Sequence, residues 1–157
     1  MNEEYNYELF IKEAKDLCEK TKNKFKIIKT QSVLNINYLK GNLNIGDDSY
    51  ILECNIIFSE VFNLPVMYFL IYDENGMIIK YEDYNKKYPL INNDCINYCE
   101  ITKENFPYGG GVYEHMHLCK FNQLLKKLPN INNKLIFCLS VILQMFNINF
   151  MEYFNFN

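Results

Sequence analysis

Residues 66–72 read Val-Met-Tyr-Phe-Leu-Ile-Tyr, an uninterrupted apolar run that stops at the turn sequence Asp73-Glu74-Asn75-Gly76. The run is shorter than an ordinary helix and rich in residues that favour strands, so it predicts a buried, central β-strand. Asn75-Gly76 accepts the positive φ angles of a tight hairpin turn, so a further strand is expected to start at Met77. A chain with this hairpin near its centre is expected to build an antiparallel sheet.

Three earlier segments also have the composition of strands, at residues 25–30, 33–39 and 50–58. Gly41 is expected to end the second of these strands. Together with residues 66–72 they predict an antiparallel meander of about four strands. Ahead of the meander, residues 3–22 carry apolar side chains at helical spacing, which predicts an amphipathic helix.

After the meander the sequence predicts a short helix, two strands and two closing helices, at residues 81–86, 100–105, 112–118, 121–128 and 135–146. Gly109-Gly110-Gly111 is expected to form the turn between the two strands, and Pro129 to end the first closing helix. The order of helix, antiparallel sheet and helices predicts an α+β fold, with helices on one face of the sheet. We expect a single domain over residues 1–157.

Charge and apolar content indicate which kinds of partner the chain is not expected to bind. The net charge of -3 and the lack of a strongly basic stretch argue against nucleic acid. No apolar run approaches the ~20 residues that span a bilayer, so no stable membrane insertion is expected. Residues 1–10 are acidic and polar, unlike a secretory signal peptide, so we expect a cytoplasmic protein. Its six cysteines are then expected to be free thiols, with Cys18, Cys54 and Cys138 in the core.

Both histidines of the chain lie in residues 112–120, which read VYEHMHLCK. Side chains two apart on a strand share a face, so His115, His117 and Cys119 are expected to line one side. Cys119 also directly precedes a predicted helix, whose N-terminal amides favour a thiolate, and a nearby imidazole could act as a base. Cys119 is therefore the candidate nucleophile.

Other interpretations of these residues stay open. Cys119 could be a small core residue, as most cysteines of cytosolic domains are. His115, His117 and Cys119 could supply three zinc ligands, with Cys95 and Cys99 as further donors, although zinc prefers other spacings. The three glycines at 109–111 could be read as a phosphate loop, but they lack the Lys and Ser/Thr of a P-loop, which favours a simple turn.

His117-Leu118-Cys119-Lys120 resembles the His-Pro-Cys motif of the autophagy conjugating enzymes, whose cysteine carries a ubiquitin-like protein. Leu64-Pro65-Val66-Met67-Tyr68-Phe69 is similar to the family's Pro-Val-Leu-Tyr-Phe strand. The resemblance covers roughly residues 50–150 and includes the turn at 73–76, the stretch 101–107 and the last helix at 135–150. Two places depart from the family pattern. Leu118 stands where the family has proline, and Asn105-Phe106 stands where it has Glu-His.

The resemblance implies a ubiquitin-conjugating-enzyme-like fold. This fold has an N-terminal helix, a curled antiparallel sheet of about four strands, an added strand pair before the catalytic cysteine, and two C-terminal helices. By the same resemblance, Cys119 carries a modifier as a thioester and passes it to a lysine. His117 would orient the thiol or steady the oxyanion, and Tyr68 would orient or activate the lysine. Core packing is the alternative role for Tyr68. The reaction needs no cofactor, because a separate activating enzyme spends the ATP.

The resemblance also implies partners. The short chain and the Pro65-Val66-Met67-Tyr68-Phe69 strand favour a member that takes autophagy-related protein twelve from an activating enzyme of the autophagy-related protein seven type. That member transfers the modifier to a lysine of autophagy-related protein five. A lipid-conjugating relative of the autophagy-related protein three type is one alternative. A conjugating-type fold that only docks partner proteins is another, because Leu118 changes the residue next to the thiol.

Overall fold

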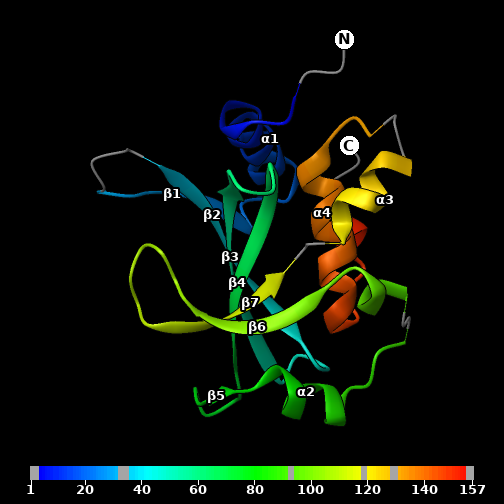
Figure 1. The fold of residues 1–157 in the computed structure, drawn as a ribbon. Helices are drawn as coiled ribbons and strands as arrows, with labels where there is room; N and C mark the ends of the chain where they lie inside the picture. The colour runs from blue at the N-terminus through cyan, green and yellow to red at the C-terminus, as the bar shows by residue number, and fades with distance from the viewer. Residues whose placement is uncertain (1–3, 32–35, 92–93, 118–119, 128–130, 155–157) are drawn as a thin grey trace.

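The computed structural model describes residues 4–31, 36–91, 94–117, 120–127 and 131–154. The strands in these ranges are β1 (Phe25–Lys29), β2 (Asn37–Ile45), β3 (Tyr50–Ser59), β4 (Leu64–Tyr72), β5 (Ile78–Ile79), β6 (Glu100–Asn105) and β7 (Val112–His117). The α-helices are α1 (Tyr7–Lys20), α2 (Tyr81–Lys87), α3 (Phe121–Lys127) and α4 (Lys134–Ile142), with 3-10 turns at Asp94–Asn97, Leu143–Phe146 and Phe150–Tyr153 (Figure 1). No helix within these ranges combines the length and the apolar character that crossing a membrane requires.

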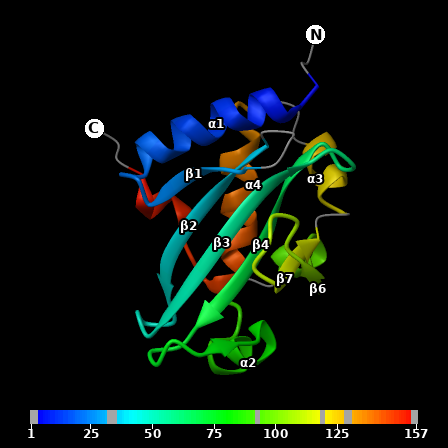
Figure 2. The same cartoon turned by 90° about the vertical axis from the view of Figure 1, so that its left-hand side faces the viewer.

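One antiparallel sheet organises the chain. Its strands follow the order β1-β2-β3-β4-β7-β6, and the short β5 pairs with β4 beyond the end of β7. The predicted meander is β1 to β4, and the predicted added strand pair is the hairpin of β6 and β7 (Figure 2). The hairpin therefore joins the sheet through β7, directly beside the apolar strand β4.

Helices α1 and α4 cover one face of this sheet, which carries the main core (Figure 2). Side chains alternate between faces along a strand. On β4, Met67, Phe69 and Ile71 belong to the main core, together with Phe10 of α1 and other fully buried residues. Burial of this apolar surface is the main stabilising contribution to the fold.

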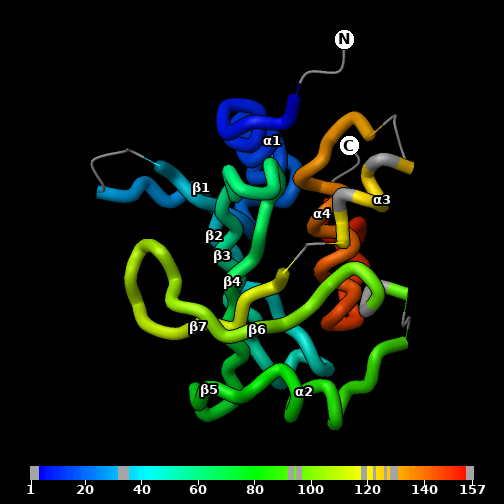
Figure 3. Tube along the Cα trace, in the orientation of Figure 1, coloured from blue at the N-terminus to red at the C-terminus, as the bar shows by residue number. Residues whose placement is uncertain are grey.

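The opposite face of the sheet carries a second, smaller apolar cluster of Ile57, Val66, Tyr68 and Phe106. Phe106 belongs to the tip of the β6–β7 hairpin, which reaches across this face below β1 and β2 (Figure 3). There Tyr108 stacks on Tyr38 of β2, with ring centroids 5.5 Å apart and planes 2° from parallel. The hairpin thus closes over the face that the helices leave uncovered.

The prediction that Gly41 ends a strand is wrong. Strand β2 runs from Asn37 to Ile45, and Gly41 lies in its middle, opposite Phe25 of β1. A Cβ atom at Gly41 would lie 2.6 Å from the Phe25 ring. The glycine therefore makes room for a buried ring, and the strand continues past it. Residues 33–35 of the predicted strand lie outside the described residues.

The first and last of the predicted helices are confirmed, but they begin or end at other residues than predicted. The predicted helix at 3–22 is α1, which starts after Asn6, whose side chain accepts a hydrogen bond from the Leu9 amide at 2.9 Å. The predicted helix at 135–146 is α4 followed by a tighter 3-10 turn at Leu143–Phe146. The tail, for which the sequence predicts no structure, places Phe150 edge-on against Phe25 in the core.

Candidate active site

Strand β7 carries both histidines and ends at His117. Leu118 and Cys119 follow, and both lie outside the described residues. The description resumes at Lys120, just before α3 begins at Phe121. The predicted strand-to-helix connection is therefore confirmed on both sides of Cys119, while the position of its thiol stays a prediction.

Tyr68 and His115 face each other across β4 and β7. They are direct partners in the strand register. Their ring centroids lie 4.4 Å apart, with planes at 33°. Both rings are on the face opposite the main core, and Tyr68 and His115 are only 7% and 5% exposed. Direct cross-strand partners have Cβ atoms close enough for such contacts, so the register itself creates this pair.

His117 lies next to His115 on the same face, as the alternation of the strand predicts. The two imidazole centroids are 5.9 Å apart, and the rings meet edge to face. His117 also packs against Phe62, at 5.3 Å between ring centroids. The structure thus brings Tyr68 and His117 into one aromatic group through His115, which lies between them.

Glu104 of β6 is a site residue that sequence reasoning missed. Its Oε1 lies 3.3 Å from Nδ1 of His115, a distance that suits an ion pair, although the contact is out of line for a ring N–H hydrogen bond. The hydroxyl of Thr102 donates a hydrogen bond to the same oxygen at 3.2 Å. Alternation along strand 100–105 places Thr102 and Glu104 on one face, but the register that brings them to His115 cannot be read from the sequence.

Burial is the main influence on the protonation of His115 and Tyr68. It lowers the pKa of His115, an effect that Glu104 opposes and His117 reinforces. Burial raises the pKa of Tyr68, and the nearby Glu104 and Tyr108 raise it further. Near neutral pH the His115 imidazole is therefore neutral, and the Tyr68 phenol keeps its proton and can donate a hydrogen bond.

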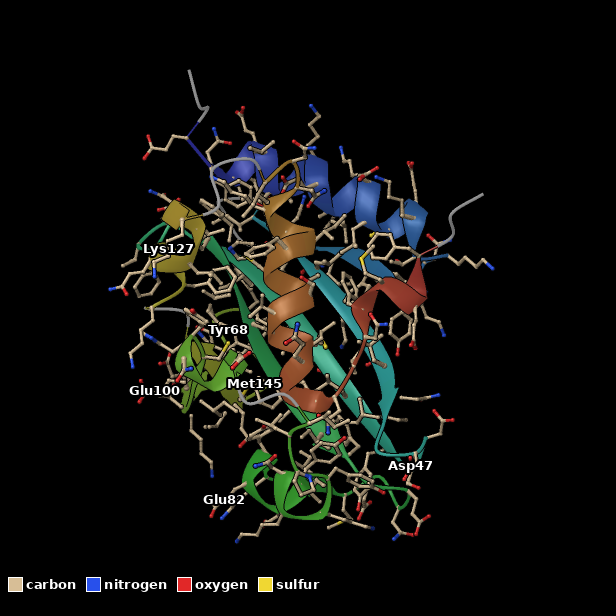
Figure 4. All side chains as sticks on the ribbon, turned by 90° about the vertical axis from the view of Figure 1, so that its right-hand side faces the viewer. Asp47, Tyr68, Glu82, Glu100, Lys127 and Met145 are labelled. Atoms are coloured by element: carbon tan, nitrogen blue, oxygen red, sulfur yellow. The ribbon has the colours of Figure 1, made fainter. Side chains whose placement is uncertain are left out.

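The site lies toward one side of the molecule. In Figure 4, Tyr68 is on the same side as Glu100 of β6 and Lys127 of α3, whereas Asp47 lies on the opposite side. Phe106 packs edge-on against Tyr68 at 5.4 Å, so the hairpin tip limits the freedom of its ring. Tyr68 therefore also packs in the smaller apolar cluster, which agrees with the packing role that the sequence leaves open for it.

The other described cysteines differ from a nucleophile in their surroundings. Cys54 and Cys138 are fully buried, as predicted, and burial raises the pKa of each thiol. Cys99 is buried as well. Cys18, which the sequence predicts in the core, is instead half-buried at the edge of the core, and burial raises the pKa of its thiol too. Within the described ranges, no three His, Cys, Asp or Glu side chains are grouped to hold a metal. The zinc alternative includes Cys119, which lies outside those ranges.

Residues 6–153 match the family model described as "Autophagocytosis associated protein, active-site domain". The chain therefore belongs to this family, and it is a ubiquitin-like protein conjugating enzyme of autophagy in the general sense that the family defines. Among solved structures it is similar to that titled "Solution structures of KmAtg10". The TM-score is 0.61 and the sequences are 14% identical, over 94% of this chain and 98% of that chain. This likeness confirms the predicted ubiquitin-conjugating-enzyme-like fold. No curated protein matches the sequence significantly.

Proposed function

We propose that this protein is a conjugating enzyme of the autophagy-related protein ten type that carries its modifier as a thioester on Cys119. The observation that carries the proposal is the family match over residues 6–153, which includes the segment from β7 through Cys119 to α3. The chain would take autophagy-related protein twelve from an activating enzyme of the autophagy-related protein seven type. It would transfer the modifier to a lysine of autophagy-related protein five, in the cytoplasm, as a single domain over residues 1–157.

The surroundings of the cysteines whose side chains the structure describes support Cys119 as the nucleophile. A thiolate is the reactive form of cysteine, and burial keeps Cys54 and Cys138 protonated and out of reach. Cys119 instead stands two residues after His117, the last residue of β7, and directly before the segment that opens α3. An imidazole at this spacing can orient the thiol or accept its proton.

The proposed reaction has two acyl transfers. In the first, the Cys119 thiolate attacks the carbonyl carbon of the modifier's C-terminal thioester, and the thiolate of the activating enzyme leaves. In the second, a neutral lysine amine attacks the new thioester. An amide bond forms, the Cys119 thiolate leaves, and the amine proton passes to solvent or to a nearby base. No ATP or metal takes part in either transfer.

His117 and Tyr68 have separate tasks in this proposal. His117 would steady the charge of the tetrahedral oxyanion or orient the thiol. Tyr68, which keeps its phenolic proton near neutral pH, would orient the acceptor amine by hydrogen bonding. Their grouping on one face with His115, 4.4 Å from Tyr68 and 5.9 Å from His117, supports a shared site.

The packing of α1 favours this proposal over the lipid-conjugating alternative. An amphipathic helix that binds a membrane must present its apolar side to the lipid. In α1 that side is fully buried in the main core through Phe10, Ala14 and Leu17. The partner-docking alternative keeps the fold but forms no thioester, so one assay separates it from the proposal.

The test is to incubate the full chain with activating enzyme, ATP and modifier, and to analyse the products by non-reducing electrophoresis. The proposal predicts an adduct that thiol reductant removes, and its loss in Cys119→Ala. Cys18→Ala, which changes the half-buried thiol of α1, is the matched control and should keep the adduct. If the wild-type chain forms no adduct while the activating enzyme does, the proposed function is wrong.

A further inference from the structure

We propose that His115 is a positioning residue for Tyr68, and that Glu104 fixes the orientation of the His115 ring. The inference rests on the proposed function, because it concerns the transfer to lysine in which Tyr68 would take part. It assigns a role to two residues outside the His-x-Cys motif: His115, which the sequence places on the face of His117 without a separate task, and Glu104, which the sequence alone does not single out.

Register places His115 against one side of the Tyr68 ring and against no other aromatic side chain of β4. The two are direct partners between β7 and β4. The Phe106 ring meets the Tyr68 ring edge-on from the hairpin tip, at 5.4 Å between centroids, and the His115 ring lies tilted against the Tyr68 ring at 4.4 Å. Phe106 and His115 together hold the Tyr68 ring in place. Because interiors are closely packed, a shift of His115 would change the space left for the Tyr68 ring and so move its phenol group.

Glu104 reaches the other side of the imidazole from β6. Thr102 is the direct register partner of His115, and Glu104 lies two residues along the same face. Its carboxylate is held by the Thr102 hydroxyl at 3.2 Å and lies 3.3 Å from Nδ1 of His115. Because the contact is out of line for a hydrogen bond, the carboxylate acts on the ring through its charge, which attracts the Nδ1 side of the imidazole and favours a proton there.

The charged and titratable groups that face His115 come from three strands. Glu104 approaches from β6, His117 from β7 and the Tyr68 phenol from β4. A proton on His115 is attracted by Glu104 and repelled by His117 when that ring is also protonated. The charge on His115 would also repel an incoming lysine ammonium. The positioning of Tyr68 is therefore coupled to pH through His115.

The first measurement is an NMR titration of the labelled full chain, which needs no partner protein. The imidazole signals of His115 and the ring signals of Tyr68 should shift with one shared midpoint, below the ordinary value of 6.5. Glu104→Gln removes the carboxylate that favours the protonated ring, so it should move both midpoints to lower pH. In His115→Phe the Tyr68 signals should no longer shift at the midpoint that His115 has in the wild type. Tyr68 signals that ignore the His115 midpoint overturn the inference.

The second measurement separates loading of Cys119 from transfer to lysine. His115→Ala should load within about twofold of wild type and discharge roughly tenfold to a hundredfold more slowly, because a small misplacement of a reacting group is costly. His115→Phe should keep much of the rate, since it keeps a packed ring. The ratio of wild-type to His115→Phe discharge should fall as pH drops through the His115 midpoint. Taking this ratio cancels the pH dependence of the lysine itself.

Each outcome decides the inference. Equal losses of loading and discharge in His115→Ala mean a merely structural role, and a ratio that does not change with pH means no coupling, so either result contradicts the proposal. Glu82→Gln, an exposed carboxylate on α2, is the matched control for Glu104→Gln and should leave the midpoint unchanged. If the wild type forms no adduct, the proposed function fails and this inference fails with it.

Discussion

At the residue scale, Gly41 decides how β1 and β2 pack. It lies opposite Phe25, a fully buried ring that occupies the space a side chain at 41 would need. The Phe25 ring in turn meets Phe150 from the C-terminal tail at 5.9 Å. One missing side chain therefore lets an aromatic side chain join the first strand pair to the end of the chain.

We predict that Gly41→Ala destabilises the protein by about 1–3 kcal/mol, the usual cost of overpacking a core. The added methyl would lie 2.6 Å from the Phe25 ring, which is buried and cannot swing into solvent. Denaturant unfolding measures the change. The exposed Gly76→Ala is not a suitable control because its φ of 76° is itself unfavourable for alanine. The exposed Asn42→Ala in the same strand is suitable and should change stability by less than about 0.5 kcal/mol.

Residue-level roles divide into those that sequence can predict and those that it cannot. Tyr68, His117 and Cys119 were predicted because they fall in motifs that can be read in order along the chain. Glu104 was not, because its contact with His115 depends on the register of β6 against β7. In a hairpin the register is set by the type and length of the turn, and the glycine-rich connection at 106–111 does not specify its own geometry from the sequence.

At the element scale, Glu13 joins the first helix to the last. This carboxylate of α1 is 7% exposed and accepts a 2.7 Å hydrogen bond from the Tyr5 hydroxyl. It also accepts hydrogen bonds from the backbone amides of Lys134 and Leu135, at 3.1 and 3.0 Å, where α4 begins. A negative charge at a helix N-terminus is favourable, so Glu13 both caps α4 and fixes its crossing over α1.

Replacing Glu13 with alanine is predicted to lower the free energy of unfolding by about 1–3 kcal/mol, because it leaves buried donors without an acceptor. Thermal and urea unfolding report the loss. Glu19→Ala, on the exposed end of the same helix, should change stability by less than about 0.5 kcal/mol. A Glu13→Ala protein as stable as wild type would contradict the role assigned to this carboxylate.

Phe106 holds the tip of the β6–β7 hairpin against the sheet by aromatic packing. This side chain is 7% exposed and packs against Tyr38, Tyr68 and Tyr113. Phe106→Ala should cost about 2–3 kcal/mol, somewhat less than a buried phenylalanine in a main core, because its cluster is small. The exposed Val112→Ala in the same hairpin is the control. A hairpin that keeps its amide protection in Phe106→Ala would show that the tip is held by other contacts.

At the scale of the whole molecule, the two faces of the sheet have different tasks. The face under α1 and α4 carries the main core, and the face under the β6–β7 hairpin carries the candidate site. The meander and the helices were predictable because local periodicity specifies them. The insertion of β7 between β4 and β6 was not, since pairing of β4 with β7 joins segments far apart in the chain. That insertion brings Tyr68 to the histidines.

Replacing the sulfur of Cys119 with oxygen decides whether this side chain carries the modifier. With activating enzyme, ATP and modifier, the wild-type chain should give an adduct that thiol reductant removes. Cys119→Ser should give an adduct that resists reductant and is cleaved by mild alkali, because an oxygen ester replaces the thioester. Peptide mapping by mass spectrometry should locate the ester at residue 119. A reductant-sensitive adduct that persists in Cys119→Ser would place the modifier on another cysteine and contradict the account.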